Sequence, residues 1–126
     1  KTYVAYFYPR DNTPGCTAEA LGFNAALDEF DAMGIKIIGV NADSVASHAK
    51  FIEKHGLRFT LLSDPDKTLL RAAGVWGTKK MYGREYEGVF RSTFLVGPDG
   101  LVSKAWKKVR VKGHVEEVLA AASAMA

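Results

Sequence analysis

Apolar residues occur in short continuous runs that alternate with segments of helical spacing. Residues 3 to 8 (YVAYFY) and 35 to 43 (IKIIGVNAD) are apolar at most positions, which is typical of strands buried on both faces of a sheet. Between these runs, apolar side chains recur at helical intervals, at Ala20, Phe23, Leu27 and Phe30. Gly34 follows the last of them, so the pattern predicts one helix that ends before this glycine.

The same alternation continues along the rest of the chain. Asp43 or Ser44 is expected to cap a second helix that ends at Gly56. The face of this helix that is expected to be buried consists of Val45, His48, Ala49 and Ile52. The later pattern predicts a strand at 57 to 64, a helix at 64 to 74, a loop at 75 to 88, strands at 90 to 96 and 101 to 111, and a helix at 114 to 125.

Strands that alternate with helices and end in a hairpin predict an α/β fold. We expect a central, mostly parallel mixed β-sheet with an antiparallel edge and helices on both faces. The chain has 126 residues, of which 48% are hydrophobic and 25% are charged, as in an ordinary globular domain. The sequence therefore predicts a single domain over residues 1–126.

The charge pattern does not indicate a nucleic-acid or membrane partner. A net charge of +3 at pH 7 is only mildly basic. Lys108, Arg110 and Lys112 alternate in a lysine-rich run, which fits a solvated edge strand, with a nucleic-acid patch as the alternative. No apolar run approaches the roughly 20 residues of a membrane span. The three histidines lack the spacing of metal ligands, so neither a metal nor another cofactor is expected.

The single cysteine, Cys16, follows a Pro-Gly turn and precedes the first predicted helix. In parallel sheets the functional crevice lies at the carboxyl ends of the strands, where strand-to-helix loops gather. The partial positive charge of a helix N-terminus favours a thiolate over a thiol. This placement indicates a reactive cysteine, and a small buried apolar side chain is the alternative. Because no second cysteine exists, no internal disulfide can form, and a reducing compartment such as the cytoplasm is expected.

The segment FYPRDNTPGCTAEA around this cysteine resembles the active-site segment of the peroxiredoxins. The likeness is to the bacterioferritin comigratory protein (BCP) or PrxQ subfamily of AhpC/TSA-type proteins, whose motif is Pro-x-x-x-Thr-x-x-Cys. Pro9, Thr13 and Cys16 stand at that spacing. The likeness continues in order through GVNADS, LLSDPD, GVWGTKKMYGREYEG, RSTFLV and VKGHVEEVL, and so covers nearly the whole chain. It implies a thioredoxin-like fold.

The resemblance also implies a thiol-dependent peroxidase that reduces hydrogen peroxide and alkyl hydroperoxides in antioxidant defence and redox homeostasis. Cys16 would be the peroxidatic cysteine, which becomes a sulfenic acid. Thr13 would hydrogen-bond the peroxide and the thiolate, and Pro9 would shield the sulfur from solvent. Arg91 of the RSTF segment would stabilise the thiolate and orient the peroxide.

Two further residues are candidates for substrate binding. The backbone N–H groups of Gly15 and Cys16 are expected to act as donors toward the charge that develops on oxygen. Glu19 matches the subfamily's TxE pattern, and complementing the helix dipole is the alternative explanation for it. For the aromatic residues of the predicted loop at 75 to 88, the sequence leaves three functions open: core, lid or wall of the peroxide pocket.

Two features depart from the family pattern. Many members carry a resolving cysteine five residues after the first, and Leu21 stands at that position here. The resemblance therefore implies a one-cysteine enzyme that an external thiol recycles, such as thioredoxin or glutathione with glutaredoxin. Members also carry a preceding N-terminal hairpin, which we expect this chain to lack. The composition indicates no large apolar stripe on the surface, so a monomer or weak dimer is expected.

Two other functions use a comparable thiol. A cysteine-dependent phosphatase needs an arginine six residues after its cysteine, and Gly22 stands at that position. A peroxide sensor or thiol-exchange binding module would use Cys16 without fast turnover. It shares its first chemical step with a peroxidase, so the sequence leaves this alternative open.

Overall fold

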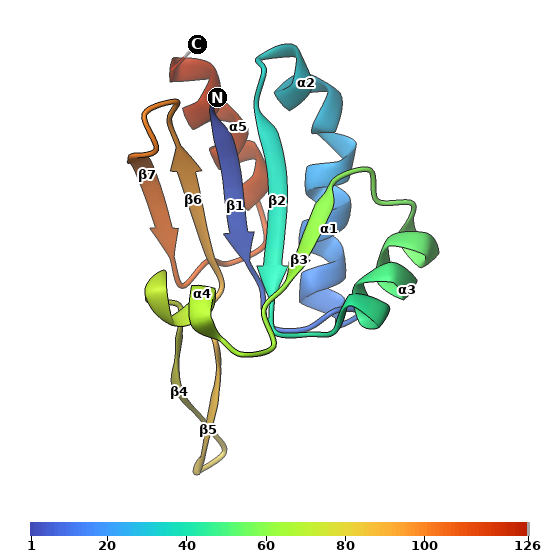
Figure 1. Ribbon diagram of the computed structural model, residues 1–126, viewed down its shortest axis with the longest axis vertical. Helices are drawn as coiled ribbons and strands as arrows, with labels where there is room; N and C mark the ends of the chain where they lie inside the picture. The colour runs from blue at the N-terminus through green and yellow to red at the C-terminus, as the bar shows by residue number, and fades with distance from the viewer. Residues whose placement is uncertain (126) are drawn as a thin grey trace.

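The computed structural model describes residues 1–125, and its centre is a five-stranded mixed sheet with the order β3-β2-β1-β6-β7 (Figure 1). The strands of this sheet are β1 (Tyr3–Phe7), β2 (Lys36–Asn41), β3 (Thr60–Ser63), β6 (Ser92–Val96) and β7 (Val102–Lys107). The β1–β2 and β2–β3 pairs are parallel, whereas the β1–β6 and β6–β7 pairs are antiparallel. The antiparallel part of the sheet thus extends over two pairs, because β6 lies beside β1 and β7 lies on the outer side of β6.

Five helices flank the sheet, as the α/β prediction requires. They are α1 (Pro14–Ala25), α2 (Leu27–Ala32), α3 (Val45–His55), α4 (Thr68–Ala72) and α5 (His114–Met125). Figure 1 shows α1, α2 and α5 behind the sheet and α4 in front of it. The prediction of one helix before Gly34 is wrong, because the backbone leaves helical geometry at Ala26, with ψ near 2°, and separates α1 from α2.

Two apolar clusters lie on opposite faces of the sheet. On the face toward the longer helices, Val4 and Tyr6 of β1 pack in one cluster with Phe23, Phe30 and Phe51. The Tyr6 ring stacks on Phe23 with centroids 4.7 Å apart, and burying one large apolar side chain contributes roughly 1.5–3 kcal/mol. The cluster on the other face consists of Phe7, Val40, Leu70, Val75 and Val89. This alternation fixes β1, and with it the loop that leads to Cys16.

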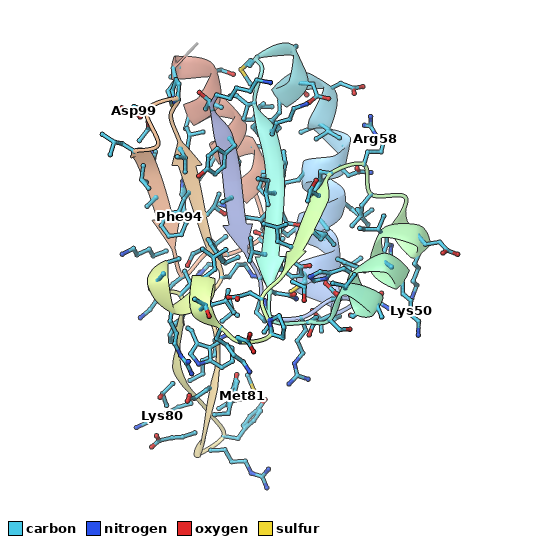
Figure 2. The ribbon with its side chains drawn as sticks, in the orientation of Figure 1. Lys50, Arg58, Lys80, Met81, Phe94 and Asp99 are labelled. Carbon is cyan, nitrogen blue, oxygen red and sulfur yellow. The ribbon has the colours of Figure 1, made fainter. Side chains whose placement is uncertain are left out.

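Cover on the α4 face is partial, although the sequence predicted helices on both faces. An open groove of about 490 Å³ runs over this face, and apolar side chains such as Ile38, Phe94 and Val102 line it. Phe94 points out from β6 on this face (Figure 2). The helix predicted at 64 to 74 is shorter than expected, because only the five residues of α4 form it.

Residues 75 to 88, predicted to form a loop, instead belong to an antiparallel hairpin. Strand β4 (Trp76–Met81) pairs with β5 (Arg84–Val89) along its whole length. Tyr82 and Gly83 connect them with φ values of 51° and 77°, as in a two-residue turn with positive φ at both central positions. The glycines in this segment concealed its strand character. Figure 1 shows that the hairpin projects away from the main sheet.

Helix α3 has the predicted ends but a partly different buried face. The caps of α3 are confirmed, since Ser44 Oγ accepts the Ser47 N–H and Gly56 is left-handed. Its buried face is only partly the predicted one: His48 is buried as predicted and Ile52 is half-buried, but Val45 and Ala49 are exposed, and Phe51 is buried instead.

The lysine-rich run does not form the expected strand face. Strand β7 ends at Lys107, and Lys108 turns the chain with a φ of 53°. The predicted alternation of Lys108, Arg110 and Lys112 therefore lies outside any strand. Within residues 1–125, every helix is too short or too polar to span a bilayer.

Candidate active site

Cys16 is the third residue of α1, directly after the loop that follows the carboxyl end of β1. Thr13 is the N-cap of this helix, and Pro14 occupies its first position. The first helical hydrogen bond runs from the Thr17 N–H to the Thr13 carbonyl, at 2.8 Å. The N–H groups of Gly15 and Cys16 precede this bond, at the positive end of the helix. The predicted position of Cys16 at the start of a helix is confirmed, and its side chain is only 1% exposed.

The Arg91 guanidinium lies against the sulfur of Cys16. Arg91 stands between β5 and β6, and its Nη2 donates to Cys16 Sγ at 3.3 Å. Gly15 permits this approach, because a Cβ atom built at this glycine would lie 3.2 Å from the same Nη2. The structure thus brings Arg91 to Cys16, which is 75 positions away in the sequence, and to the neighbouring Gly15. A fixed positive charge in this position favours the negative charge of a thiolate.

Glu19 holds the other side of the same guanidinium. Its carboxylate is fully buried, and Oε1 accepts a hydrogen bond from Arg91 Nη1 at 2.7 Å. Burial raises the pKa of Glu19 to about 7, against the charge and the hydrogen bond of Arg91, which lower it. Because the side chain faces Arg91 from the interior, the geometry favours a positioning role over direct substrate contact or dipole complementation.

Thr13 and Pro9 lie in the loop that precedes the helix, and both are half-buried. The Thr13 hydroxyl donates to the Arg10 carbonyl at 3.0 Å. Within residues 1–125 it makes no hydrogen bond to Cys16. Because its proton is used in this way, the Thr13 oxygen is available to accept a hydrogen bond from a peroxide O–H.

A buried polar network that the sequence analysis missed fixes this loop to α3. The Asp11 carboxylate accepts hydrogen bonds from the Tyr8 hydroxyl at 2.6 Å, the Ser47 hydroxyl at 2.7 Å and His48 Nδ1 at 2.7 Å. The Asp11 N–H donates to Asp43 Oδ2 at 2.7 Å. Residues 8 to 13, which include Pro9 and Thr13, are therefore held at several points.

His48 carries a positive charge within this network. Its Nδ1 faces the Asp11 carboxylate and its Nε2 faces the Leu62 carbonyl at 3.0 Å, so both ring nitrogens must donate. Burial alone would lower the pKa of His48, but the hydrogen bond and charge of Asp11 raise it above 6.5. Burial alone would raise the pKa of Asp11, but hydrogen bonds from His48, Tyr8 and Ser47 hold it below 3.8. The sequence placed His48 on the face of its helix that was expected to be buried, and this position was the signal that could have indicated a charged partner.

Replacing His48 with glutamine should lower the free energy of unfolding by about 3 kcal/mol at mildly acidic pH, because it leaves Asp11 buried without its cation. The pair is complete between the usual pKa values of 3.8 for aspartate and 6.5 for histidine. Since the pKa of His48 is raised in the folded protein, the contribution persists past pH 6.5 and declines as the pH rises through the raised value. Denaturant unfolding from about pH 5 to about pH 9 measures the difference between the two proteins.

His55→Gln is the matched control for this experiment. The His55 ring makes one long hydrogen bond, of 3.3 Å, to the Asn12 side chain. Its replacement should change stability by less than about 1 kcal/mol at every pH. An equal loss in the two variants, or a loss in His48→Gln that grows with pH, would contradict the assignment of a charged pair.

No metal centre is evident in the part of the chain that the structure describes. Within residues 1–125, no group of three or more histidine, cysteine, aspartate or glutamate side chains could hold a metal ion. The buried His114 ring lies 2.8 Å from the Thr93 hydroxyl.

Known proteins are similar to this chain over nearly its full length. The AhpC/TSA family model matches residues 1–105, a range that includes Cys16 and Arg91. Peroxiredoxin Bcp of Xanthomonas campestris is 55% identical over 123 residues, which cover 98% of this chain and 77% of that protein. Peroxiredoxin Bcp of Bacillus subtilis is 50% identical over 119 residues, which cover 94% of this chain and 76% of that protein.

Solved structures share the fold as well. The bacterioferritin comigratory protein of Xanthomonas campestris, studied for its alkyl peroxide reduction activity, has a TM-score of 0.96 and 54% identity, and the match covers 99% of this chain and 79% of that one. Peroxidoxin BcpB of Mycobacterium tuberculosis has a TM-score of 0.87 and 31% identity, over 99% of this chain and 80% of that one. The predicted thioredoxin-like fold is confirmed by these likenesses.

Proposed function

Because the chain belongs to the AhpC/TSA family and is a thiol-dependent peroxidase of the Bcp and PrxQ kind, we propose that Cys16 is the thiol that attacks the peroxide. This assignment rests on the hydrogen bond that Arg91 Nη2 donates to Cys16 Sγ at 3.3 Å. Cys16 is also the only cysteine of the chain. The family and activity that the FYPRDNTPGCTAEA segment predicted are thus confirmed, and the roles of single residues are our proposal.

In the first step the Cys16 thiolate attacks the terminal oxygen of the peroxide. A sulfur–oxygen bond forms and the oxygen–oxygen bond breaks, so the sulfur is oxidised and the peroxide is reduced. The product is a sulfenic acid on Cys16. The remaining oxygen leaves as hydroxide or alkoxide and takes up a proton to give water or an alcohol. Negative charge thus moves from sulfur to oxygen during the step.

Arg91 stabilises charge on both atoms of this transfer. Its Nη2 already contacts the sulfur, and Glu19 fixes the guanidinium from behind. The N–H groups of Gly15 and Cys16 supply further donors at the helix start, and Thr13 accepts from the peroxide O–H. Donors that are fixed before the reaction stabilise developing charge without reorganisation. Pro9 limits the access of water to the sulfur.

An external thiol completes the cycle. Cys16 has no second cysteine to pair with, and Leu21, the position expected of a resolving cysteine, is 42% exposed on α1. A thiol attacks the sulfenic acid, which gives a mixed disulfide and water. A second thiol then releases the Cys16 thiol and an external disulfide. We propose thioredoxin, or glutathione with glutaredoxin, as the source of these thiols.

The remaining parts of the proposal concern substrate and setting. We propose hydrogen peroxide and alkyl hydroperoxides as substrates, the latter supported by the activity studied in the Xanthomonas campestris protein. A free thiol as catalyst suits a reducing compartment, and we propose the cytoplasm. We propose a monomer or weak dimer as the working form.

External recycling predicts a defined order of covalent states at Cys16. One equivalent of peroxide should raise the intact mass by one oxygen atom, and added glutathione should then give a mixed disulfide before free thiol returns. Mass spectrometry of quenched samples follows these states, with Cys16→Ser as the unreactive control. Turnover that continues without added thiol would contradict external recycling. Oxidation that proceeds while recycling stays slow would favour a peroxide sensor instead.

A further inference from the structure

A second cavity lies beside the Cys16 site, between the β4–β5 hairpin and the loop after β1. Its volume is about 470 Å³, within the usual range for small organic ligands. Its lining includes Pro9, Arg10, Lys67, Trp76, Lys79 and Tyr86. We call this cavity the hairpin pocket. It combines three cationic side chains with two aromatic rings.

Among the residues that the structure describes, the three cations of the hairpin pocket have no carboxylate partner. Within residues 1–125, the ion pairs belong to other basic residues, namely His48, Arg58 and Arg91. The ammonium groups of Lys67 and Lys79 lie instead 5.4 and 5.6 Å from the centroids of aromatic rings. Positive charge thus gathers around one cavity without forming ion pairs there, which favours an anionic ligand.

Two acidic residues also line the hairpin pocket, so its three cations and two carboxylates leave a net charge of +1, and within residues 1–125 neither carboxylate forms an ion pair with these cations. Asp43 Oδ2 accepts hydrogen bonds from the Asp11 N–H at 2.7 Å and from the Asn41 amide at 2.9 Å. These donors are neutral, so they hold the Asp43 carboxylate against the loop and leave its charge in place. Glu87 is exposed on β5, opposite Thr78. A ligand with one carboxylate would still meet an excess of positive charge.

The hairpin pocket and the Cys16 site are close enough to interact. Pro9 belongs to both, because it lines the cavity and also lies in the loop that leads to Cys16. Burial, together with the positive charge of Arg91, lowers the pKa of Lys79, and the charge of Cys16 opposes this. Lys79 is therefore within electrostatic range of both catalytic groups.

We propose that the hairpin pocket binds the carboxylate of a small organic molecule and holds that molecule beside Cys16. Arg10, Lys67 and Lys79 attract the carboxylate, and Trp76 and Tyr86 contact the apolar body. The inference rests on the proposed function, since it assigns a ligand class to the same centre. Two reactants have this chemistry, namely a carboxylate-bearing hydroperoxide and a carboxylate-bearing thiol. They act in different half-reactions, which can be measured separately.

Binding is tested without any turnover, by titrating the reduced protein with butyrate and recording the indole N–H resonances of its two tryptophans. The Trp76 resonance should shift to a saturating value, because this ring lines the hairpin pocket. Trp106 lies on β7 and lines a different cavity with cations such as Lys107, Lys108 and Arg110, so its resonance is an internal control that reports the general attraction of carboxylates to cationic side chains. A Trp76 shift that does not saturate, or an equal shift of Trp106, would mean that no specific carboxylate site exists.

The kinetic test uses two adjacent lysines with different surroundings. Lys79 is half-buried and lines the hairpin pocket, whereas Lys80 is exposed, since successive strand residues face opposite sides. Figure 2 shows Lys80 near the free end of the hairpin. Lys79→Gln and Lys80→Gln therefore remove the same charge from neighbouring positions, only one of which lines the cavity.

Each variant is oxidised by a short carboxylate-bearing hydroperoxide and by its methyl ester, and the sulfenic acid is reduced by mercaptopropionate and by its methyl ester. Lys79→Gln should lower the acid-to-ester rate ratio by about tenfold in one half-reaction, as expected for a lost hydrogen bond to a charged group. Lys80→Gln should leave both ratios nearly unchanged. A fall in the oxidation ratio identifies a peroxide ligand, and a fall in the reduction ratio identifies a thiol ligand.

Unchanged ratios in Lys79→Gln, or equal changes in the two variants, would overturn the proposal. Equal changes would mean that the carboxylate senses only the overall charge of the hairpin. The butyrate titration separates a failure of the carboxylate-binding proposal from a failure of the proposed peroxidase function. If the protein does not reduce peroxide at all, the titration still decides whether the hairpin pocket binds a carboxylate.

Discussion

Replacing Cys16 with serine should abolish peroxide reduction, to the rate measured without protein. The serine hydroxyl stays protonated at neutral pH and cannot act as the nucleophile that Cys16 supplies. No other thiol can replace it, since the chain has one cysteine. Peroxide consumption with excess thiol is the measurement. Activity retained in Cys16→Ser would contradict the assignment of the peroxidatic residue.

A loss of activity is informative only if the variant remains folded. Cys16 is almost completely buried, and serine is close to it in size, so the unfolding transition should remain cooperative. Cys16→Ala is a second variant that places no hydroxyl beside Arg91. The two variants should be equally inactive, because both lack the sulfur atom.

Replacing Arg91 with glutamine should slow the oxidation of Cys16 by about 100-fold to 1,000-fold, as removal of one fixed donor does in other oxyanion sites. Glutamine is polar but shorter than arginine, and it has no charge to favour the thiolate. It also leaves Glu19 buried without its cation, and a buried carboxyl without a partner takes up a proton. Stopped-flow measurement of Cys16 oxidation by hydrogen peroxide gives the rate.

Two further variants separate the charge of Arg91 from its geometry. Arg91→Lys keeps the charge, but one ammonium group cannot repeat the contacts that Nη1 makes to Glu19 and Nη2 makes to Cys16. Its rate should lie between those of the wild type and Arg91→Gln. Arg84→Gln, on the exposed β5 strand, should oxidise at the wild-type rate. A rate in Arg91→Gln that equals the rate in Arg84→Gln would remove Arg91 from the mechanism.

Those parts of the fold that depend on a dominant local signal were predicted well from the sequence. The apolar runs at β1 and β2 and the Gly56 cap of α3 are present in the structure, whereas Pro14 and Gly15, predicted to form a turn before the helix, are the first two residues of α1. Each rests on a property of the residues themselves, such as the left-handed φ that glycine adopts without cost. The helix start also placed Cys16 correctly, because proline is favoured in the first turn.

The errors occurred where no strong local signal marks the structure. The β4–β5 hairpin was predicted to be a loop, since three of its positions are glycines and its alternation is weak. The break between α1 and α2 has no glycine or proline to announce it. The spacing of apolar residues alone therefore identifies neither a strand with weak alternation nor a break between two consecutive helices.

The candidate site shows the same division. The family motif indicated Cys16, Thr13 and Pro9 within eight residues of one another, and the matching RSTF segment indicated Arg91. The Asp11–His48 pair joins residues that are 37 positions apart, and neither residue has a motif of its own. The buried position of Glu19 behind Arg91 likewise follows from the folded arrangement and not from its place in the helix.

Arg91 and the start of α1 stabilise the Cys16 thiolate and so make its oxidation by peroxide fast. The most direct test is the rate of Cys16 oxidation by hydrogen peroxide across pH, with dimedone trapping and mass spectrometry to identify the product. We expect oxidation at neutral pH that is about 1,000-fold or more faster than that of free cysteine, with a trappable sulfenic acid as the product. Oxidation no faster than that of free cysteine would contradict the account.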